Sequence, residues 1–182
     1  MVYSHEHNKA ETGEIKLEEV LIGQESFYKI SNAELMRPFF MTIVSDSDHW
    51  MFVSSNGGIS AGRKNAEYAL FPYYTDDKIT ESAEITGSKT ILRMIINGRL
   101  VVWEPFSARS EALHNLQRNV YKNRYGNKII FEEVNKDLSL TFSYEWNSSH
   151  LYGFVRKARL SNHAAEAITV DVLHALQNVS PH

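Results

Sequence analysis

Residues 138–146 constrain the fold of this 182-residue chain more than any other segment. Apolar and polar side chains alternate strictly there, and the apolar set is Leu138, Leu140, Phe142, Tyr144 and Trp146. An alternation of period two places the apolar set on one face of a β-strand and the polar set on the other. The pattern predicts an antiparallel sheet that packs against a core on one side.

A second strong signal lies in residues 90–103, which are rich in branched apolar side chains. Asn97-Gly98 interrupts this run, and the dipeptide suits a type I′ hairpin turn because both central residues need positive φ. Such a turn pairs Leu92 with Trp103 across the two strands. We therefore predict a hairpin with one apolar face and one partly wet face.

The same rules predict further strands. Gly126-Asn127 fits a type II′ turn, with the glycine at the first central position, and an apolar run begins at Ile129. Alternation or β-branched runs predict four more strands, over residues 39–44, 50–54, 153–160 and 167–176. Turn signals at short, regular intervals across these segments predict an all-β fold, an antiparallel β-sandwich.

Three parts of the chain differ from this pattern. Ser110 can cap a helix over residues 110–120. The acidic segment over residues 11–25 predicts a leading strand or arm, so we divide the chain into an N-terminal arm or leading strand (1–37) and a β-sandwich domain (38–182). The chain passes from an apolar segment to its end without a polar tail, so we expect the sandwich to be truncated at its C-terminus, as a fragment of a longer enzyme.

Composition argues against several classes of site and partner. The chain has no cysteine, which excludes disulfides, thiolate zinc sites and iron–sulfur clusters. Its 19 Lys and Arg residues against 22 Asp and Glu residues give a net charge of −3, unlike a nucleic-acid coat or a polybasic membrane binder. No run approaches the roughly 20 apolar residues that span a bilayer, and the N-terminus lacks a signal-peptide pattern, so we expect a cytoplasmic protein.

Histidines and basic residues are present but do not form a recognisable site. His5 and His7 have no third ligand recognisably near them, so we expect no metal and no cofactor. Basic and aromatic side chains interleave over residues 118–128, as in some nucleic-acid-binding segments, but Glu132 and Glu133 follow directly. We interpret this segment as a solvated hairpin face and expect no nucleic-acid partner.

The most unusual run is residues 54–65, where glycine, serine and basic residues cluster. Gly57 and Gly62 have the spacing of a phosphate-binding loop, but Arg63 stands where that motif needs lysine, and no Ser or Thr follows Lys64. A glycine-bent strand or a surface loop is the better interpretation. In either form Arg63 and Lys64 are candidate contacts to an anionic or hydroxylated ligand.

A second candidate run places Tyr73 and Tyr74 close to Asp76 and Asp77. Proteins bind sugars with aromatic faces beside carboxylates, because C–H faces stack on rings while hydroxyl groups need acceptors. Paired carboxylates also catalyse glycoside hydrolysis, but adjacent acids on an extended chain point to opposite faces. We assign the four residues as candidate carbohydrate contacts, favour loop salt bridges for the aspartates, and assign no catalytic residue.

Five runs carry a resemblance to a known family. They are Trp-Met-Phe-Val-Ser-Ser-Asn-Gly-Gly at residues 50–58, Leu-Thr-Phe-Ser-Tyr-Glu-Trp at residues 140–146, and the segments 156–162, 168–172 and 176–179. In order and spacing they resemble inverting glycoside phosphorylases of the cellobiose and chitobiose phosphorylase type. The similarity covers the chain from Trp50 to its end.

The resemblance implies the N-terminal β-supersandwich of those enzymes, a galactose-mutarotase-like fold that precedes a helical toroid. It also implies that the catalytic acid, an aspartate, lies on the toroid and that phosphate replaces water as the nucleophile. No region of this chain matches the toroid, so the resemblance implies a piece that does not carry the reaction. Residues 59–64 depart from the family's glycine run, which leaves the sugar unassigned.

The leading hypothesis is therefore a non-catalytic N-terminal β-sandwich domain of a carbohydrate-active enzyme, serving domain packing, dimerisation and glycan contact. The alternatives are an independent carbohydrate-binding module and a small aldose epimerase-like enzyme. The expected partners are carbohydrate, the C-terminal helical toroid of the parent protein, and a second copy. We expect the homodimer to form through the sheet that contains Val170 and Val172.

Overall fold

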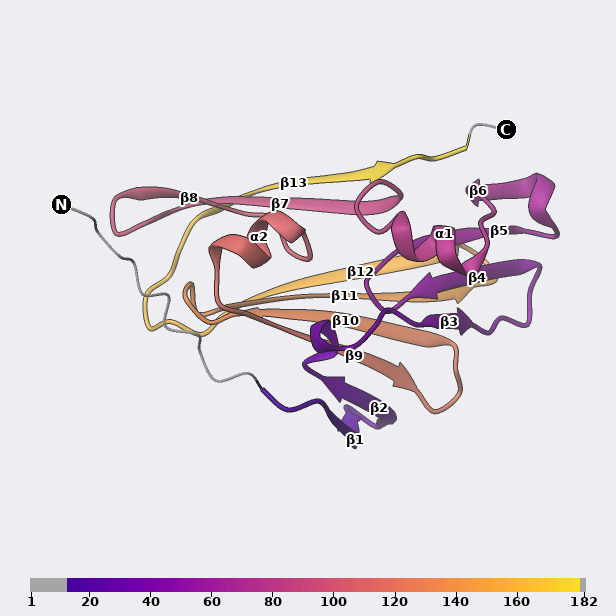
Figure 1. Cartoon of the computed structure of the whole chain (residues 1–182), viewed down its shortest axis with the longest axis horizontal. Coiled ribbons are helices and arrows are strands. Elements are labelled where there is room, and N and C mark those ends of the chain that lie inside the picture. The colour runs from indigo at the N-terminus through magenta and orange to yellow at the C-terminus, as the bar shows by residue number, and fades with distance from the viewer. Residues whose placement is uncertain (1–12, 181–182) are drawn as a thin grey trace.

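The computed structural model describes residues 13–180, whose strands form three antiparallel sheets (Figure 1). Strands account for 54% of the residues and helices for 11%, which confirms the predicted all-β sandwich. The sheets have six, three and four strands. In Figure 1 the three-stranded sheet lies above the central strands of the six-stranded sheet, and the four-stranded sheet lies at the right-hand end.

The six-stranded sheet has the order β1-β2-β9-β10-β11-β12. Its strands are β1 (Lys16–Ile22), β2 (Glu25–Ser31), β9 (Leu116–Asn123), β10 (Lys128–Asn135), β11 (Leu140–Ser149) and β12 (Gly153–Asn162). The predicted alternation is confirmed in β11, where Leu140, Phe142, Tyr144 and Trp146 are buried and the residues between them are only partly buried. The acidic N-terminal segment contributes a hairpin to this sheet, because β2 pairs with β9.

The three-stranded sheet has the order β13-β7-β8 and contains the hairpin predicted around Asn97-Gly98. Its strands are β7 (Gly87–Ile96), β8 (Arg99–Trp103) and β13 (Val170–Gln177). The predicted register is confirmed, since Leu92 pairs with Trp103. Asn97 and Gly98 have φ values of 52° and 72°, as a type I′ turn requires.

The four-stranded sheet consists of β3 (Phe40–Ile43), β4 (His49–Ser54), β5 (Ile59–Arg63) and β6 (Ala69–Phe71), in that order. The run interpreted as a glycine-bent strand is β5, which bulges between Ala61 and Gly62. A Cβ on Gly62 would lie 2.6 Å from the Trp50 ring and 2.5 Å from the Tyr68 carbonyl oxygen, so only glycine fits there. The helical elements are short: η1 (Ala33–Leu35), η2 (Ala66–Tyr68), α1 (Asp76–Glu81) and α2 (Ala108–Leu113).

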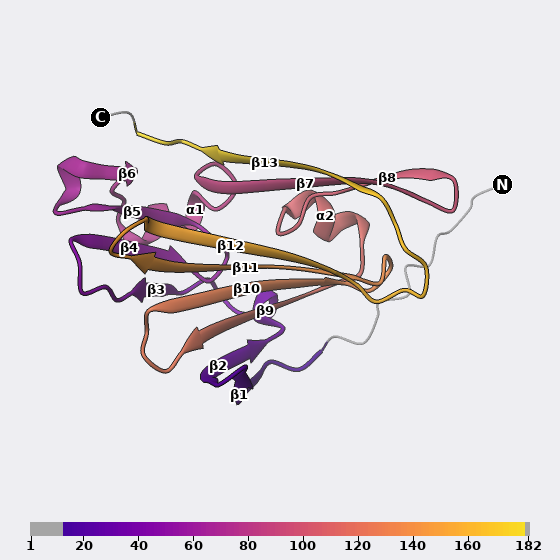
Figure 2. The same ribbon diagram turned by 180° about the vertical axis from the view of Figure 1, so that it is seen from behind.

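One hydrophobic core joins the three sheets. Trp103 and Leu92 come from the three-stranded sheet, Phe131 and Ile129 from the six-stranded sheet, and Met51 from the four-stranded sheet, and each of these side chains is at most 2% exposed. Each such residue contributes about 2–3 kcal/mol when it leaves water. Figure 2 shows the same three sheets from behind.

The helix predicted over residues 110–120 is wrong in its extent and its cap. The helix α2 ends at Leu113, and Ser107 caps it by accepting a hydrogen bond from the Ser110 amide at 3.0 Å. The chain from Leu116 onward is β9 instead, because it pairs with both β2 and β10. Pairing on both edges outweighs the local helical periodicity.

The hairpin between β9 and β10 is confirmed, but its predicted type II′ turn is wrong. The Gly126 amide donates to the Asn123 carbonyl oxygen at 3.0 Å, so the tight turn has Arg124 and Tyr125 at its centre. Gly126 follows that turn with φ at 75°, where glycine relieves the strain of a left-handed backbone.

Candidate functional site

An open cleft of about 700 Å³ lies beside the end of β5. We call it the Arg63 cleft, and the side chains used in the argument below are His49, Arg63, Lys64, Tyr68, His150 and Tyr152. These residues come from β4, from β5 and the η2 turn that follows it, and from the turn between β11 and β12. The cleft therefore joins the four-stranded sheet to the far end of the six-stranded sheet.

The backbone after β5 fixes where the two basic residues stand. Lys64 has φ at 59°, a left-handed conformation that a lysine adopts only when its surroundings hold it there. Its amide donates to the Asp48 carbonyl oxygen at 2.7 Å, and its ammonium group lies 5.5 Å from the centre of the Tyr68 ring. The cation is thus held over an aromatic face at the edge of the cleft.

The turn between β11 and β12 supplies an exposed aromatic rim. The amides of Leu151 and Tyr152 both donate to the Ser149 hydroxyl oxygen at 3.3 Å. Gly153 then adopts φ at 71°, which starts β12 without strain. This arrangement leaves Tyr152 77% exposed at the rim, where its ring is available to stack on a ligand.

Two imidazoles complete the cleft. The His49 ring packs edge-on against Phe154, with 5.1 Å between ring centres, and its Nδ1 lies 2.7 Å from the Ser47 hydroxyl. The Nε2 atom of His150 lies 3.0 Å from a carboxylate oxygen of Asp46. Asp46 itself is not among the cleft-lining residues, and the lining side chains offer hydrogen-bond donors and aromatic faces.

The structure brings together two of the six residues singled out from the sequence, Arg63 and Lys64. Tyr73 lies outside the cleft lining and packs its ring edge against Trp50, with 5.6 Å between ring centres. The Tyr74 hydroxyl accepts a weak hydrogen bond from the Asn178 side chain at 3.3 Å. The six residues come from two separate runs of the chain, and the fold places only the first run in the cleft.

Asp76 and Asp77 occupy the first turn of α1, not an extended loop. Both side chains are exposed, and neither forms an ion pair with another described residue, so the predicted loop salt bridges are wrong. Carboxylates are favourable at a helix N-terminus because the unpaired amides there carry partial positive charge. Their position accounts for both aspartates as helix-stabilising residues.

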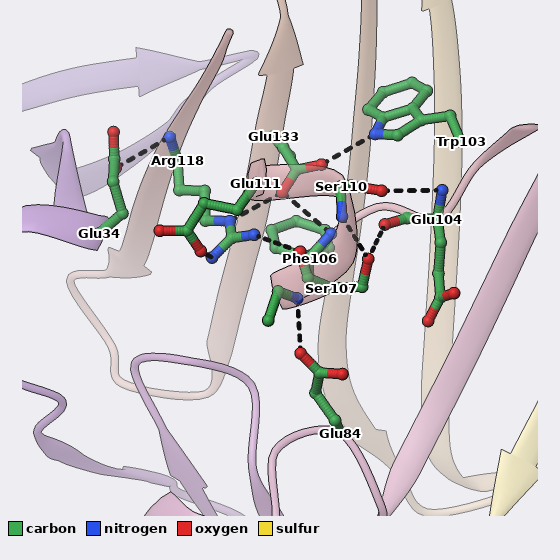
Figure 3. A network of polar contacts seen from close by, with 11 residues as sticks. Glu34, Glu84, Trp103, Glu104, Phe106, Ser107, Ser110, Glu111, Arg118 and Glu133 are labelled. Atoms are coloured by element: carbon green, nitrogen blue, oxygen red, sulfur yellow. Dashed lines mark hydrogen bonds and ion pairs between the residues drawn. The ribbon is translucent and has the colours of Figure 1, made fainter. Parts of the chain in front are cut away.

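A second cluster of chemically capable side chains is buried beneath α2 (Figure 3). Glu133 on β10 has no exposed surface, and its carboxylate accepts hydrogen bonds from Trp103 Nε1 at 3.0 Å, the Phe106 amide at 2.9 Å and Arg118 Nε at 2.7 Å. Arg118 continues the network to Glu111 at 3.1 Å. The donors surround the carboxylate, so it is a structural group and not a free general base.

This cluster corrects the interpretation of residues 118–128 as a solvated hairpin face, because the Arg118 side chain pairs with the buried Glu133. Strand β10 points Glu132 outward, where it accepts from the Tyr121 hydroxyl at 2.7 Å, and points Glu133 inward. Two adjacent acids thus lie on opposite faces, and donors from β8, from β9 and from the Phe106 amide after β8 make burial of Glu133 tolerable.

Sequence reasoning missed Tyr152 and the two cleft histidines. Tyr152 stands in a short polar turn between two clear strands, and an exposed aromatic residue beside a glycine in such a turn is a usable signal. His49 and His150 are far apart in the chain and meet only because β4 and the β11–β12 turn face the same cleft.

Within residues 13–180, no three or more metal-ligating side chains gather in a way that would hold an ion. None of the helices in the same range is long and apolar enough to cross a membrane. Comparisons with known proteins add no family: no protein-family model matches the chain, and no curated protein matches it either.

Proposed function

We propose that this chain is a non-catalytic β-sandwich domain of a carbohydrate-active enzyme and that it contacts glycan through the Arg63 cleft. The observation that carries the proposal is the lining of that cleft. Exposed tyrosine faces stand beside guanidinium, ammonium and imidazole donors. Sugars offer C–H faces that stack on rings and hydroxyl oxygens that accept from such donors.

The resemblance to glycoside phosphorylases supports the wider setting of this proposal. In that setting the chain is the galactose-mutarotase-like N-terminal sandwich of a cytoplasmic parent enzyme, and it packs against a C-terminal helical toroid. An independent carbohydrate-binding module would use the same cleft without a toroid.

The experiment is calorimetric titration of the full chain with cellobiose, N,N′-diacetylchitobiose and maltose. We expect measurable binding of at least one β-linked disaccharide. Replacing the stacking ring, in Tyr152→Ala, weakens that binding about tenfold, which corresponds to about 1.4 kcal/mol. Arg63→Ala weakens it in the same direction, because the cleft loses its fork of donors.

The matched control is Tyr125→Ala, which removes a tyrosine that is 79% exposed in the β9–β10 turn, outside the cleft lining. Its affinity should equal that of the parent chain. Equal losses in Tyr125→Ala and Tyr152→Ala would refute a role for this cleft. Rapid interconversion of sugar anomers by the purified chain, abolished by His150→Ala, would replace the proposal with the epimerase-like alternative.

A further inference from the structure

Arg156 lies between the sheets without a counter-ion among the described residues. It is on the inner face of β12, opposite Trp146 on β11, and its guanidinium carbon lies 4.3 Å from the centre of the Tyr144 ring. No Asp or Glu within residues 13–180 forms an ion pair with it. Its Nε atom is buried and has no hydrogen-bond partner. A buried arginine nitrogen normally has a hydrogen-bond partner.

A small polar cavity adjoins this guanidinium. It has a volume of about 30 Å³, and its lining includes residues of β7, β11 and β12. Arg156, Tyr144, Ser88, Lys89 and Thr90 are among its lining residues. The Ser88 hydroxyl is also buried without a partner, so two unsatisfied polar groups border the same space.

The other charged groups around the cavity are already paired. Lys89 forms ion pairs with Glu84 and Glu104, and a Glu84 carboxylate oxygen also accepts from the Ala108 amide at 2.6 Å. Partial burial and then the nearby positive charge of Arg156 lower the pKa of His174, which contacts Thr90. The charge of Arg156 therefore acts on His174 and is not neutralised by an ion pair with a described carboxylate.

We propose that this cavity binds one small anion, chloride or a small carboxylate such as formate, on the Arg156 guanidinium. The planar fork of arginine matches a carboxylate in a two-point contact, and a halide is held by the same donors. The Ser88 hydroxyl donates the remaining hydrogen bond. The volume corresponds to about two water molecules, which excludes sugars and larger organic anions.

The test is ³⁵Cl NMR of the full chain in sodium chloride, with sodium gluconate holding the ionic strength constant. Chloride that exchanges with a protein site gives a broadened line. We expect the excess broadening to fall as chloride is added, because the site fills and a fixed number of sites is shared by more chloride ions. Displacement by formate shows that a carboxylate shares the site, and excess broadening that formate leaves unchanged assigns the site to halide. The melting temperature should also be higher in chloride than in gluconate, because only the folded chain has the cavity.

Arg156→Met should abolish the excess broadening. The matched control is Arg159→Met, on the exposed outer face of the same strand, which should keep it. If Arg156→Met does not fold, the chloride dependence of the broadening and the melting temperatures of the parent chain decide the question. Excess broadening that is absent or does not change with chloride concentration, with equal melting temperatures in the two salts, means that the cavity holds only water and overturns the proposal.

Discussion

The carboxylate of Glu133 on β10 accepts a hydrogen bond from the indole Nε1 of Trp103 on β8 at 3.0 Å, and neither side chain is exposed to solvent. This bond links the six-stranded sheet to the three-stranded sheet through the middle of the core. Arg118 supplies the compensating positive charge from the neighbouring strand β9. The two sheets are therefore held in one relative position by a polar contact as well as by apolar packing.

Glu133→Gln should destabilise the fold strongly. Three donors point at the carboxylate, and a glutamine amide would turn its own NH₂ group toward at least one of them, leaving Arg118 without its counter-ion. We expect a loss of about 3 kcal/mol in the free energy of unfolding, measured by urea denaturation. Glu67→Gln, at an exposed position, is the control and should change it by less than about 0.5 kcal/mol. Equal effects of the two substitutions would contradict the structural role of Glu133.

Gly58→Ala should also destabilise the fold, for a steric reason. A Cβ at Gly58 would lie 1.9 Å from the Ile79 carbonyl oxygen, so α1 would have to move away from the start of β5. We expect a cost of about 3 kcal/mol by urea denaturation. Gly23→Ala is the comparison, because a Cβ there meets nothing within 4 Å and the only cost is its positive φ, about 1 kcal/mol. A smaller loss for Gly58→Ala than for Gly23→Ala would mean that α1 does not approach so closely.

The predicted strands and the buried Glu133 show which parts of the structure the sequence predicts and which it does not. Period-two alternation predicts the strand β11, and turn chemistry predicts the hairpin at Asn97-Gly98. Both signals are local, so the sequence alone is enough to recognise them. The burial of Glu133 depends on Trp103, 30 residues away, and on the pairing of β9 with β10, so no local sequence pattern predicts it.

The residues of the candidate site also divide into those that a local sequence pattern predicts and those that only the fold brings together. Arg63 and Lys64 were found because a glycine-rich run is conspicuous, whereas Tyr152 and His49 join them only through the packing of two sheets. The prediction of a helix over residues 110–120 is wrong for the same reason, namely that contacts distant in the chain decide the structure. Strand β9 is stabilised by its partner strands β2 and β10 rather than by its own propensity.

Glu34 should make the protein's stability depend on pH. Burial raises the pKa of this carboxyl above its usual value of 4.5, so the folded chain binds the proton more tightly than the unfolded chain. The stabilising contribution of the protonated form is complete below pH 4.5 and is lost as the pH rises through the higher folded pKa. Glu34→Gln keeps an acceptor for the Arg118 amide and should flatten this part of the stability profile, measured by denaturation from pH 4 to 7. An unchanged profile would show that Glu34 is not desolvated.

A homodimer should form through β13, the edge strand of the three-stranded sheet. Four apolar side chains on the outer face of that sheet are exposed: Ile95, Leu100, Val102 and Leu173. Strand β13 contains no lysine or proline, the residues that commonly prevent an edge strand from pairing with another chain. Val170 packs on the core, so Leu173→Lys, at a side chain 63% exposed, is the cleaner variant.

Light scattering over a concentration series should show a dimer for the parent chain and a monomer for Leu173→Lys. The control is Leu113→Lys, at a side chain 62% exposed at the end of α2, which should remain dimeric. A parent chain that stays monomeric at high concentration would contradict the proposed interface.

Chemical-shift mapping of backbone amides shows whether glycan binds in the Arg63 cleft. The full chain, labelled with ¹⁵N, is titrated with cello- and chito-oligosaccharides. We expect saturable chemical-shift changes confined to the amides of residues 62–64 and 149–154, on the two sides of the cleft. Shifts that cluster at residues 73–77, or the absence of saturable shifts with every sugar, would contradict it.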